Sequence, residues 1–167
     1  MERLALDRDE VRFATRSGDL YVRRDGGLMV LDLPAAPGEK CAPLGALVRG
    51  LRAEPSETYR ASNYMAISEN QDAVMALDPD LAALAELFPS GVIASAPGRA
   101  GDFVSRFFAP GHGIPEDPVT GSAHCTLVPY WSNRLGRQTL EAQRRASLQG
   151  SWHARCHRRA RRPVYGR

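Results

Sequence analysis

The amino-acid sequence predicts an α+β fold, in which strands come first and helices and strands then follow in irregular order. Two observations support this class. Residues 11–33 contain short β-prone runs separated by glycine-containing turns, which is typical of hairpins. After Pro34, apolar residues at helical spacing mix with further β-prone runs, without the regular alternation of strand and helix that builds a parallel sheet.

The first segment is expected to form three strands joined by hairpin turns. The run Pro34-Ala-Ala-Pro-Gly38 interrupts this pattern and marks a boundary, because prolines and glycine break regular structure. The expected strands are residues 11–16, 20–24 and 28–33. The chain is accordingly divided into a hairpin segment, a larger second segment and a basic tail, at residues 1–37, 38–150 and 151–167.

The second segment is expected to mix helices and strands. Apolar residues recur at helical spacing between Leu44 and Leu51, which predicts a helix at residues 43–52. Asp80 is a suitable N-cap for a later helix, because its carboxylate can accept the free N–H groups of a first turn. The other expected elements are a strand at 59–68, helices at 70–77 and 81–88, and strands at 91–96 and 102–110.

A helix expected at residues 122–135 is apolar around nearly its whole circumference. Its apolar side chains run from Ala123 to Leu135, and Gly136 is a suitable residue to end it. A helix of this kind is buried, so we expect strands to wrap it. Pro129 removes one of its backbone hydrogen bonds and can kink it.

The stretch EDPVTGSAHC, residues 116–125, leads into this helix and is the candidate functional site. If Gly121 and Ser122 open a buried helix, its first N–H groups and its macrodipole would attract a carboxylate or phosphate. Gly121 allows a ligand to approach closely, and Thr120 and Ser122 add hydroxyl groups. Asp117 can bind a polar group or move a proton. The same residues also suit a capped turn before a helix, and both interpretations stay open.

Other residue combinations near this stretch support no site. Ser122 and His124 lie two positions apart on a helix and point in different directions, so they do not form a nucleophile–base pair. His112, His124 and Cys125 lack the paired spacing of metal ligands, and no metal is expected. Cys125 is expected to pack as a small apolar residue in the buried helix.

Composition and charge limit the class of protein. Apolar residues make up 43% and charged residues 25% of the 167 residues, as in globular proteins. The sequence shows no membrane span and no secretory signal, and three scattered cysteines suit a reducing cytoplasm. The formal net charge of +3 arises in the tail, residues 151–167, which holds six arginines and no acid. This tail is expected to be unstructured, and nucleic acid is not the expected partner.

Residues 105–136, SRFFAPGHGIPEDPVTGSAHCTLVPYWSNRLG, closely resemble the signature of the phenazine-biosynthesis (PhzF-like) isomerase family. The similarity extends upstream through RFATRSGDLYVRRDGGLMVLDLPAAP and ALDPDLAALAELFPSGVIASAPG, and covers roughly residues 11–147. The resemblance implies the diaminopimelate epimerase fold, in which two lobes each wrap a central helix. It places the active site between the facing starts of these two helices.

The resemblance also implies a cofactor-independent isomerase or epimerase that moves a proton within a small anionic substrate, for example in phenazine-type biosynthesis. Asp117 is implied to contact or protonate this substrate, and Thr120, Gly121 and Ser122 to bind it. Related epimerases carry a cysteine near this helix start, so Ser122 argues against racemisation by a thiol. We expect a homodimer in the cytoplasm, with no membrane partner.

Two departures from the family pattern bear on function. The N-terminal half of the family carries a glutamate that serves as acid and base, and this sequence shows no counterpart of it. Residues 1–37 are therefore interpreted as the remnant of a first lobe, and we expect the chain alone to show little or no turnover. A non-catalytic binding or assembly module is the main alternative, and a tail that binds nucleic acid is a third interpretation.

The second departure follows QRRAS, residues 143–147. The family continues there into its closing strands, whereas this chain continues into a sequence rich in Arg, His and Trp. We predict that a reading-frame change, or degradation of the end of the gene, produced this sequence. Sequencing the encoding DNA across the junction should then reveal a strand-like continuation in another frame. Two alternative frames without such a continuation would contradict the prediction.

Overall fold

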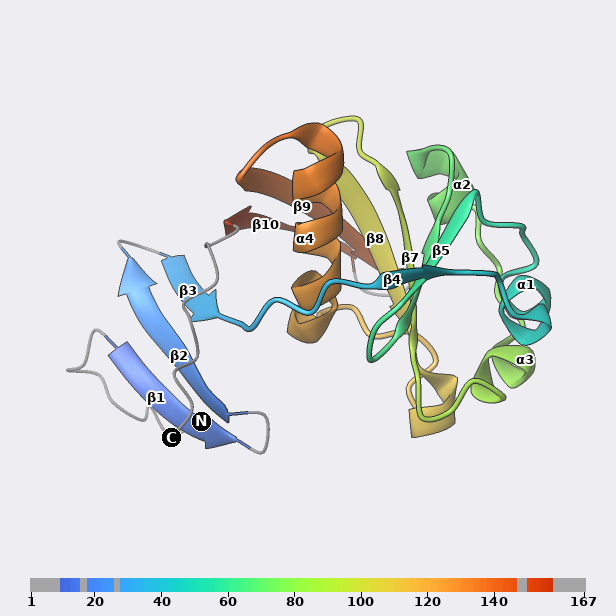
Figure 1. Ribbon diagram of the computed structural model, residues 1–167, viewed down its shortest axis with the longest axis horizontal. Coiled ribbons are helices and arrows are strands. Elements are labelled where there is room, and N and C mark those ends of the chain that lie inside the picture. The colour runs from blue at the N-terminus through green and yellow to red at the C-terminus, as the bar shows by residue number, and fades with distance from the viewer. Residues whose placement is uncertain (1–9, 16–17, 26–27, 147–149, 158–167) are drawn as a thin grey trace. The chain divides into compact units, whose positions relative to one another are not determined.

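The residues that the computed structural model describes are 10–15, 18–25, 28–146 and 150–157. Their contacts divide the chain into two units, Met1–Pro34 and Ala35–Arg167. The first unit is β-sheet, and every described helix belongs to the second unit (Figure 1). None of these described helices is both long and apolar enough to cross a membrane.

The first unit is an antiparallel sheet in the order β1–β2–β3. Its register places Val11 opposite Val22, Phe13 opposite Leu20, and Val22 opposite Leu31. Directly opposite residues share a face, so these apolar side chains lie on one side of the sheet. The three expected strands are confirmed, with bounds of Glu10–Thr15 (β1), Gly18–Asp25 (β2) and Leu28–Asp32 (β3).

The second unit is built on a seven-stranded sheet in the order β10–β9–β8–β7–β6–β5–β4. Neighbouring strands are antiparallel except β6 with β7 and β8 with β9, which are parallel. This mixed sheet with its few helices confirms the α+β class. The strands are β4 Glu39–Cys41, β5 Glu57–Arg60, β6 Tyr64–Ile67, β7 Val92–Pro97, β8 Phe103–Phe108, β9 Thr139–Ala146 and β10 Gly150–His157.

Two sequence-based expectations about this sheet are wrong. The single strand expected at 59–68 is instead the antiparallel pair β5 and β6, because the chain turns where the N–H of Ala61 donates to the carbonyl of Asn63 (3.0 Å). The tail was expected to be unstructured, yet β10 pairs with β9 along its whole length. Backbone hydrogen bonds to a neighbouring strand do not depend on acidic or apolar composition, which explains the difference. Residues 158–167 of the tail lie outside the described residues.

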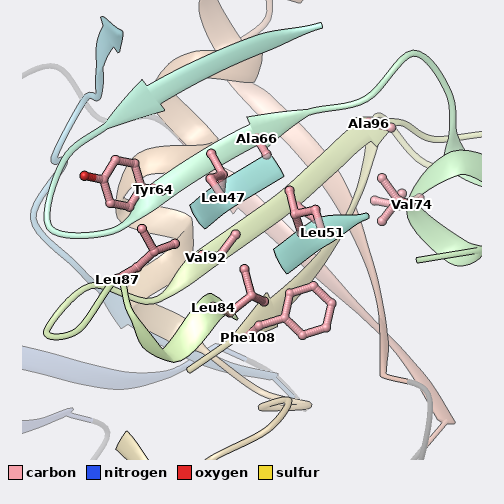
Figure 2. Packing of buried hydrophobic residues seen from close by; sticks show 12 residues of the cluster. Leu47, Leu51, Tyr64, Ala66, Val74, Leu84, Leu87, Val92, Ala96 and Phe108 are labelled. Carbon is pink, nitrogen blue, oxygen red and sulfur yellow. The ribbon is translucent and has the colours of Figure 1, made fainter. Parts of the chain in front are cut away.

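Three short helices cover one face of the sheet, and the expected helices are thus confirmed in shortened form. They bury a first hydrophobic cluster together with alternate residues of β6, β7 and β8 (Figure 2). The helices are α1 Gly45–Leu51, α2 Gln71–Met75 and α3 Leu81–Ala85. The buried members of the cluster are Leu47, Leu51, Tyr64, Ala66, Val74, Leu84, Leu87, Val92, Ala94, Ala96, Val104 and Phe108.

Local features of the sequence fix how α1 and α3 meet. Asp80 caps α3 as expected, since its Oδ1 accepts from the N–H groups of Ala82 (3.0 Å) and Ala83 (3.1 Å). Gly50 allows the two helices to approach closely, because a Cβ atom there would lie 2.2 Å from Cδ2 of Leu84. A side chain at this position would force Leu84 or one of the two helices to shift.

The opposite face of the sheet is covered by α4, His124–Leu135. Leu127 and Trp131 of this helix are almost completely buried, at 0% and 1% exposure. The Trp131 ring stacks on Phe103 with centroids 5.8 Å apart, and its Nε1–H donates to Oγ of Ser95 at 3.0 Å. These contacts tie α4 to the two central strands β7 and β8, and they build a second hydrophobic cluster.

The rest of the helix surface is covered only in part. The N–H of Ala36 donates to the carbonyl of Cys125 (2.8 Å), so the segment before β4 runs along another side of α4. The expectation of a buried, strand-wrapped helix is therefore confirmed for most of its length. It is wrong for Leu135, which is 40% exposed because the helix leaves the sheet in its last turn. Gly136 ends the helix as expected, with a φ of 66°.

We expect Trp131→Ala to lower the free energy of unfolding by about 3–5 kcal/mol, because removing the indole ring creates a cavity between α4 and the sheet. The matched variant Leu135→Ala should cost less than about 1 kcal/mol, since this side chain is already partly in water. Urea unfolding followed by circular dichroism measures both. Equal losses would show that α4 is not held through its Trp131 face.

Candidate functional site

The stretch expected to form the site is a turn between β8 and α4. The N–H of Asp117 donates to the carbonyl of Phe107 at 3.0 Å, which ties the turn to the end of β8. The Asp117 carboxylate closes the turn, because Oδ1 accepts from the N–H of Val119 (2.9 Å) and Oδ2 accepts from the Thr120 hydroxyl. Such a local side-chain-to-backbone turn is a common use of aspartate. It holds the Asp117 carboxylate in one orientation.

The helix starts directly after this turn. A 3-10 turn (η2, Gly121–Ala123) comes first, and the α-helix proper begins at His124. Thr120 occupies the N-cap position of η2, but no side-chain cap is formed there, and its hydroxyl donates to Asp117. The expectation of a side-chain-capped helix start is therefore wrong in this respect. Ser122 is exposed, whereas Thr120 is buried at 8% exposure.

A buried ion pair that the sequence analysis missed lies directly behind this turn. Arg106 on β8 and Glu116 make two parallel hydrogen bonds, Nε to Oε1 at 2.8 Å and Nη2 to Oε2 at 2.9 Å. Their side chains are only 4% and 10% exposed. Nη1 of Arg106 also donates to the carbonyls of Val74 (3.2 Å) and Leu77 (2.7 Å), and its guanidinium lies 4.9 Å from the centre of the Phe108 ring.

The sequence did contain a signal for this pair. In a strand, residues two apart share a face, so Arg106 lies between Val104 and Phe108 on one side of β8. Both of these neighbours are apolar and buried. A charged side chain between them has to find an opposite charge, because an unpaired buried charge is very costly. Glu116, ten residues later, is that partner.

A second polar cluster borders the last turn of α4. Glu57 accepts hydrogen bonds from the Tyr59 hydroxyl (2.5 Å) and from Nη1 of Arg134 (2.7 Å), which also donates to the Tyr130 hydroxyl (2.6 Å). The cluster flanks a recess of about 340 Å³. None of the residues expected at the site lines this recess. Its lining is Pro37, Gly38, Tyr59, Met65, Pro129, Tyr130, Asn133 and Arg134.

The titration behaviour of this cluster argues against acid–base catalysis there. The hydrogen bond to Glu57, with some burial, raises the pKa of Tyr59 to about 12. Hydrogen bonds from Tyr59 and then Arg134 lower the pKa of Glu57. Both pKa values thus move away from neutrality, where a general acid or base works best. Burial also raises the pKa of Cys125, and that of Cys156 to about 11, so neither thiol is activated as a nucleophile.

His112 and His124 each contact a different backbone carbonyl. Nε2 of His112 lies 2.9 Å from the carbonyl of Pro89, and Nδ1 of His124 lies 3.3 Å from the carbonyl of Thr120. Within the part of the chain that the structure describes, no group of three or more His, Cys, Asp or Glu side chains is placed to hold a metal ion.

Comparison with solved structures defines the class of protein. The chain is similar to the crystal structure of a phenazine biosynthesis protein of the PhzF family from Enterococcus faecalis, with a TM-score of 0.81 and 34% sequence identity. That match covers 89% of this chain and 57% of the other. A putative phenazine biosynthesis PhzC/PhzF protein from Clostridium difficile gives a TM-score of 0.79 at 31% identity, over 90% and 58% of the two chains. The fold is therefore the diaminopimelate epimerase-like fold of this class.

Sequence comparison then identifies the family. The chain is 42% identical over 140 residues to one uncharacterized isomerase of Pseudomonas aeruginosa, and 44% identical over 136 residues to another. These matches cover 84% and 81% of this chain but 54% and 52% of the relatives. The phenazine biosynthesis-like protein family (PhzC-PhzF) matches residues 1–161, and the chain belongs to this family. The chain spans about half the length of the curated relatives it matches.

We expect Glu57→Gln to lower the pKa of Tyr59 from about 12 toward 10, because the carboxylate that holds its proton is removed. The raised pKa of Tyr59 stabilises the fold below pH 10, and this contribution is lost as the pH rises through 12. Between pH 10 and 12, Glu57→Gln should therefore lose less stability than the unmodified chain. Phenolate absorbance in a pH titration measures the pKa, and Tyr59→Phe identifies the signal. An unchanged titration in Glu57→Gln would contradict the assignment.

Proposed function

We propose that the second unit supplies one wall of the active site of an isomerase or epimerase that moves a proton within a small carboxylate substrate. The observation that carries this proposal is the junction between β8 and α4, where an oriented aspartate precedes the start of a buried helix. The naming of the Pseudomonas aeruginosa relatives as isomerases supports the same reaction class. Neither a metal nor a cofactor is part of the proposed mechanism.

The helix start is proposed to bind the anionic group of the substrate. The first N–H groups of α4 and its 3-10 turn point toward the helix start, where the aligned peptide dipoles place partial positive charge. Gly121 has no side chain to obstruct a ligand, and the exposed hydroxyl of Ser122 adds a donor. A carboxylate bound at this position would be fixed by backbone groups that need no reorganisation.

Asp117 is proposed to contact the substrate near the atom that gains or loses a proton. Each of its oxygens already accepts one hydrogen bond, from Val119 and from Thr120. Because the turn fixes the orientation of the carboxylate, no side-chain freedom is lost when the substrate binds.

The acid–base glutamate implied by the family resemblance would come from the first lobe. We therefore propose that Asp117 acts together with a second proton-transferring group, since such a group typically contributes about 10²–10⁴-fold in rate. Deuterium uptake from heavy water into a cyclic dienoic acid, or into an amino acid at its α-carbon, measures turnover. Ordinary enzyme rates with residues 1–167 by themselves would overturn the proposal that a second group is required.

Ligand binding tests the wall of the site directly. We expect benzoate, as a simple cyclic carboxylate, to shift the amide NMR signals of Gly121 and Ser122 and to give density beside Ser122 in soaked crystals. Ser122→Asp should weaken binding by at least about tenfold, because it places a like charge within a few ångströms of the carboxylate. The exposed control Gln138→Glu adds the same charge elsewhere and should bind normally. Equal binding by both variants would exclude the helix start as the anion site.

A further inference from the structure

We propose that the buried pair Arg106–Glu116 is a positioning device, which holds Asp117 and the turn before α4 in the geometry that the active site needs. Neither residue is assigned contact with the substrate, so they are positioning residues and not catalytic ones. The inference rests on the function proposed for Asp117 and Ser122. The ion pair gives the turn before α4 a defined shape, although the loop that leads to it is irregular.

The guanidinium of Arg106 is held at every side. It donates two parallel hydrogen bonds to Glu116, at 2.8 and 2.9 Å, and two more to the carbonyls of Val74 and Leu77. Four of its five N–H groups are thereby used, and the Phe108 ring lies beside the group. A planar group with this many fixed partners has one orientation only. The two hydrogen bonds from Arg106 therefore also fix the orientation of the Glu116 carboxylate.

Stability alone does not explain a charged pair at this place. Removing two charges from water is expensive, and well-packed apolar residues of similar size often serve a core equally well or better. Arg106 nevertheless lies between two apolar residues of the first hydrophobic cluster, Val104 and Phe108. The paired charges supply a direction that apolar contacts lack, because two parallel hydrogen bonds specify both distance and angle.

The pair is connected to the site by one peptide bond. Arg106 and Phe107 are consecutive on β8, and they hold the consecutive residues Glu116 and Asp117 by two points. The first point is the side-chain pair, and the second is the bond from the N–H of Asp117 to the carbonyl of Phe107 (3.0 Å). A peptide held at two points cannot rotate, so the position of the Asp117 carboxylate relative to β8 is fixed. That carboxylate in turn fixes Val119 and Thr120, the last residues before the helix start.

The test compares Glu116→Gln, which keeps the shape but removes the charge, with Arg106→Lys, which keeps the charge but removes the two-pronged geometry. We expect amide hydrogen exchange at Asp117, Val119 and Ala123, whose N–H groups are hydrogen-bonded in the turn, to accelerate by at least about tenfold in both variants. Exchange at core amides of β6 and β7 should change by less than about threefold. Benzoate binding should weaken in parallel with the local exchange.

The matched control is Glu86→Gln, because Glu86 pairs with Arg49 at 3.0 Å on the surface, with both side chains more than half exposed. Its exchange and its benzoate binding should equal those of the unmodified chain. Exchange is measured without ligand, so it tests the positioning role even if benzoate does not bind. Failure of binding in the unmodified chain would count against the proposed function only.

A third variant separates positioning from simple core stability. Arg106→Met combined with Glu116→Leu should recover thermal stability relative to the single variants, because the core then contains no unpaired charge. We expect its local exchange to stay fast and its benzoate binding to stay weak. Normal exchange and binding in this double variant would overturn the proposal, since any packed pair would then suffice. Unchanged exchange, or equally faster exchange throughout the chain, in the two single variants would also overturn the proposal. The single variants therefore decide the test even if the double variant does not fold.

Discussion

The second unit depends on one constraint, namely that both faces of its central strands carry apolar side chains and both must be covered. On β7, Ala94 belongs to the cluster under α1–α3, and its direct neighbour Ile93, which points to the opposite face, belongs to the cluster under α4. Helices on both sides are therefore required for burial. The stacking of Trp131 on Phe103 places α4 across these strands, and the start of the helix is thereby brought next to the end of β8.

Two of the buried polar side chains in this packing, Ser95 and Arg106, have defined hydrogen-bond partners. Ser95 faces α4, where its Oγ accepts from Trp131 and donates to the carbonyl of Val104 at 2.8 Å. Arg106 faces the other side of the sheet and is bound by Glu116 and two carbonyl groups. Buried polar groups with all their partners in place specify one arrangement more strictly than apolar contacts do. Both of these groups act on the strands that lead into the site.

The two ends of α4 have different chemistry, in line with the direction of its dipole. The last turn carries Arg134, whose positive charge suits the negative end of the helix and is satisfied by Glu57. The first turn carries no acidic side chain, and the carboxylate of Asp117 is bound within the preceding turn. The positive end of the dipole is thus the end proposed to take a ligand, while the cluster at the other end fixes the helix to β5.

The sequence by itself determined the class of fold, most of the helices, the buried character of α4 and the candidate stretch from Asp117 to Ser122. These depend on periodicity, turn residues and a long family motif, which are local and can be read along the chain. Only the tertiary structure decided that Thr120 binds Asp117 and not the helix start, and that β10 continues the sheet. It also decided that Arg106 and Glu116 meet, because side-chain pairing depends on which segments lie side by side. That arrangement follows from burying both faces of one sheet, and no short stretch of sequence contains it.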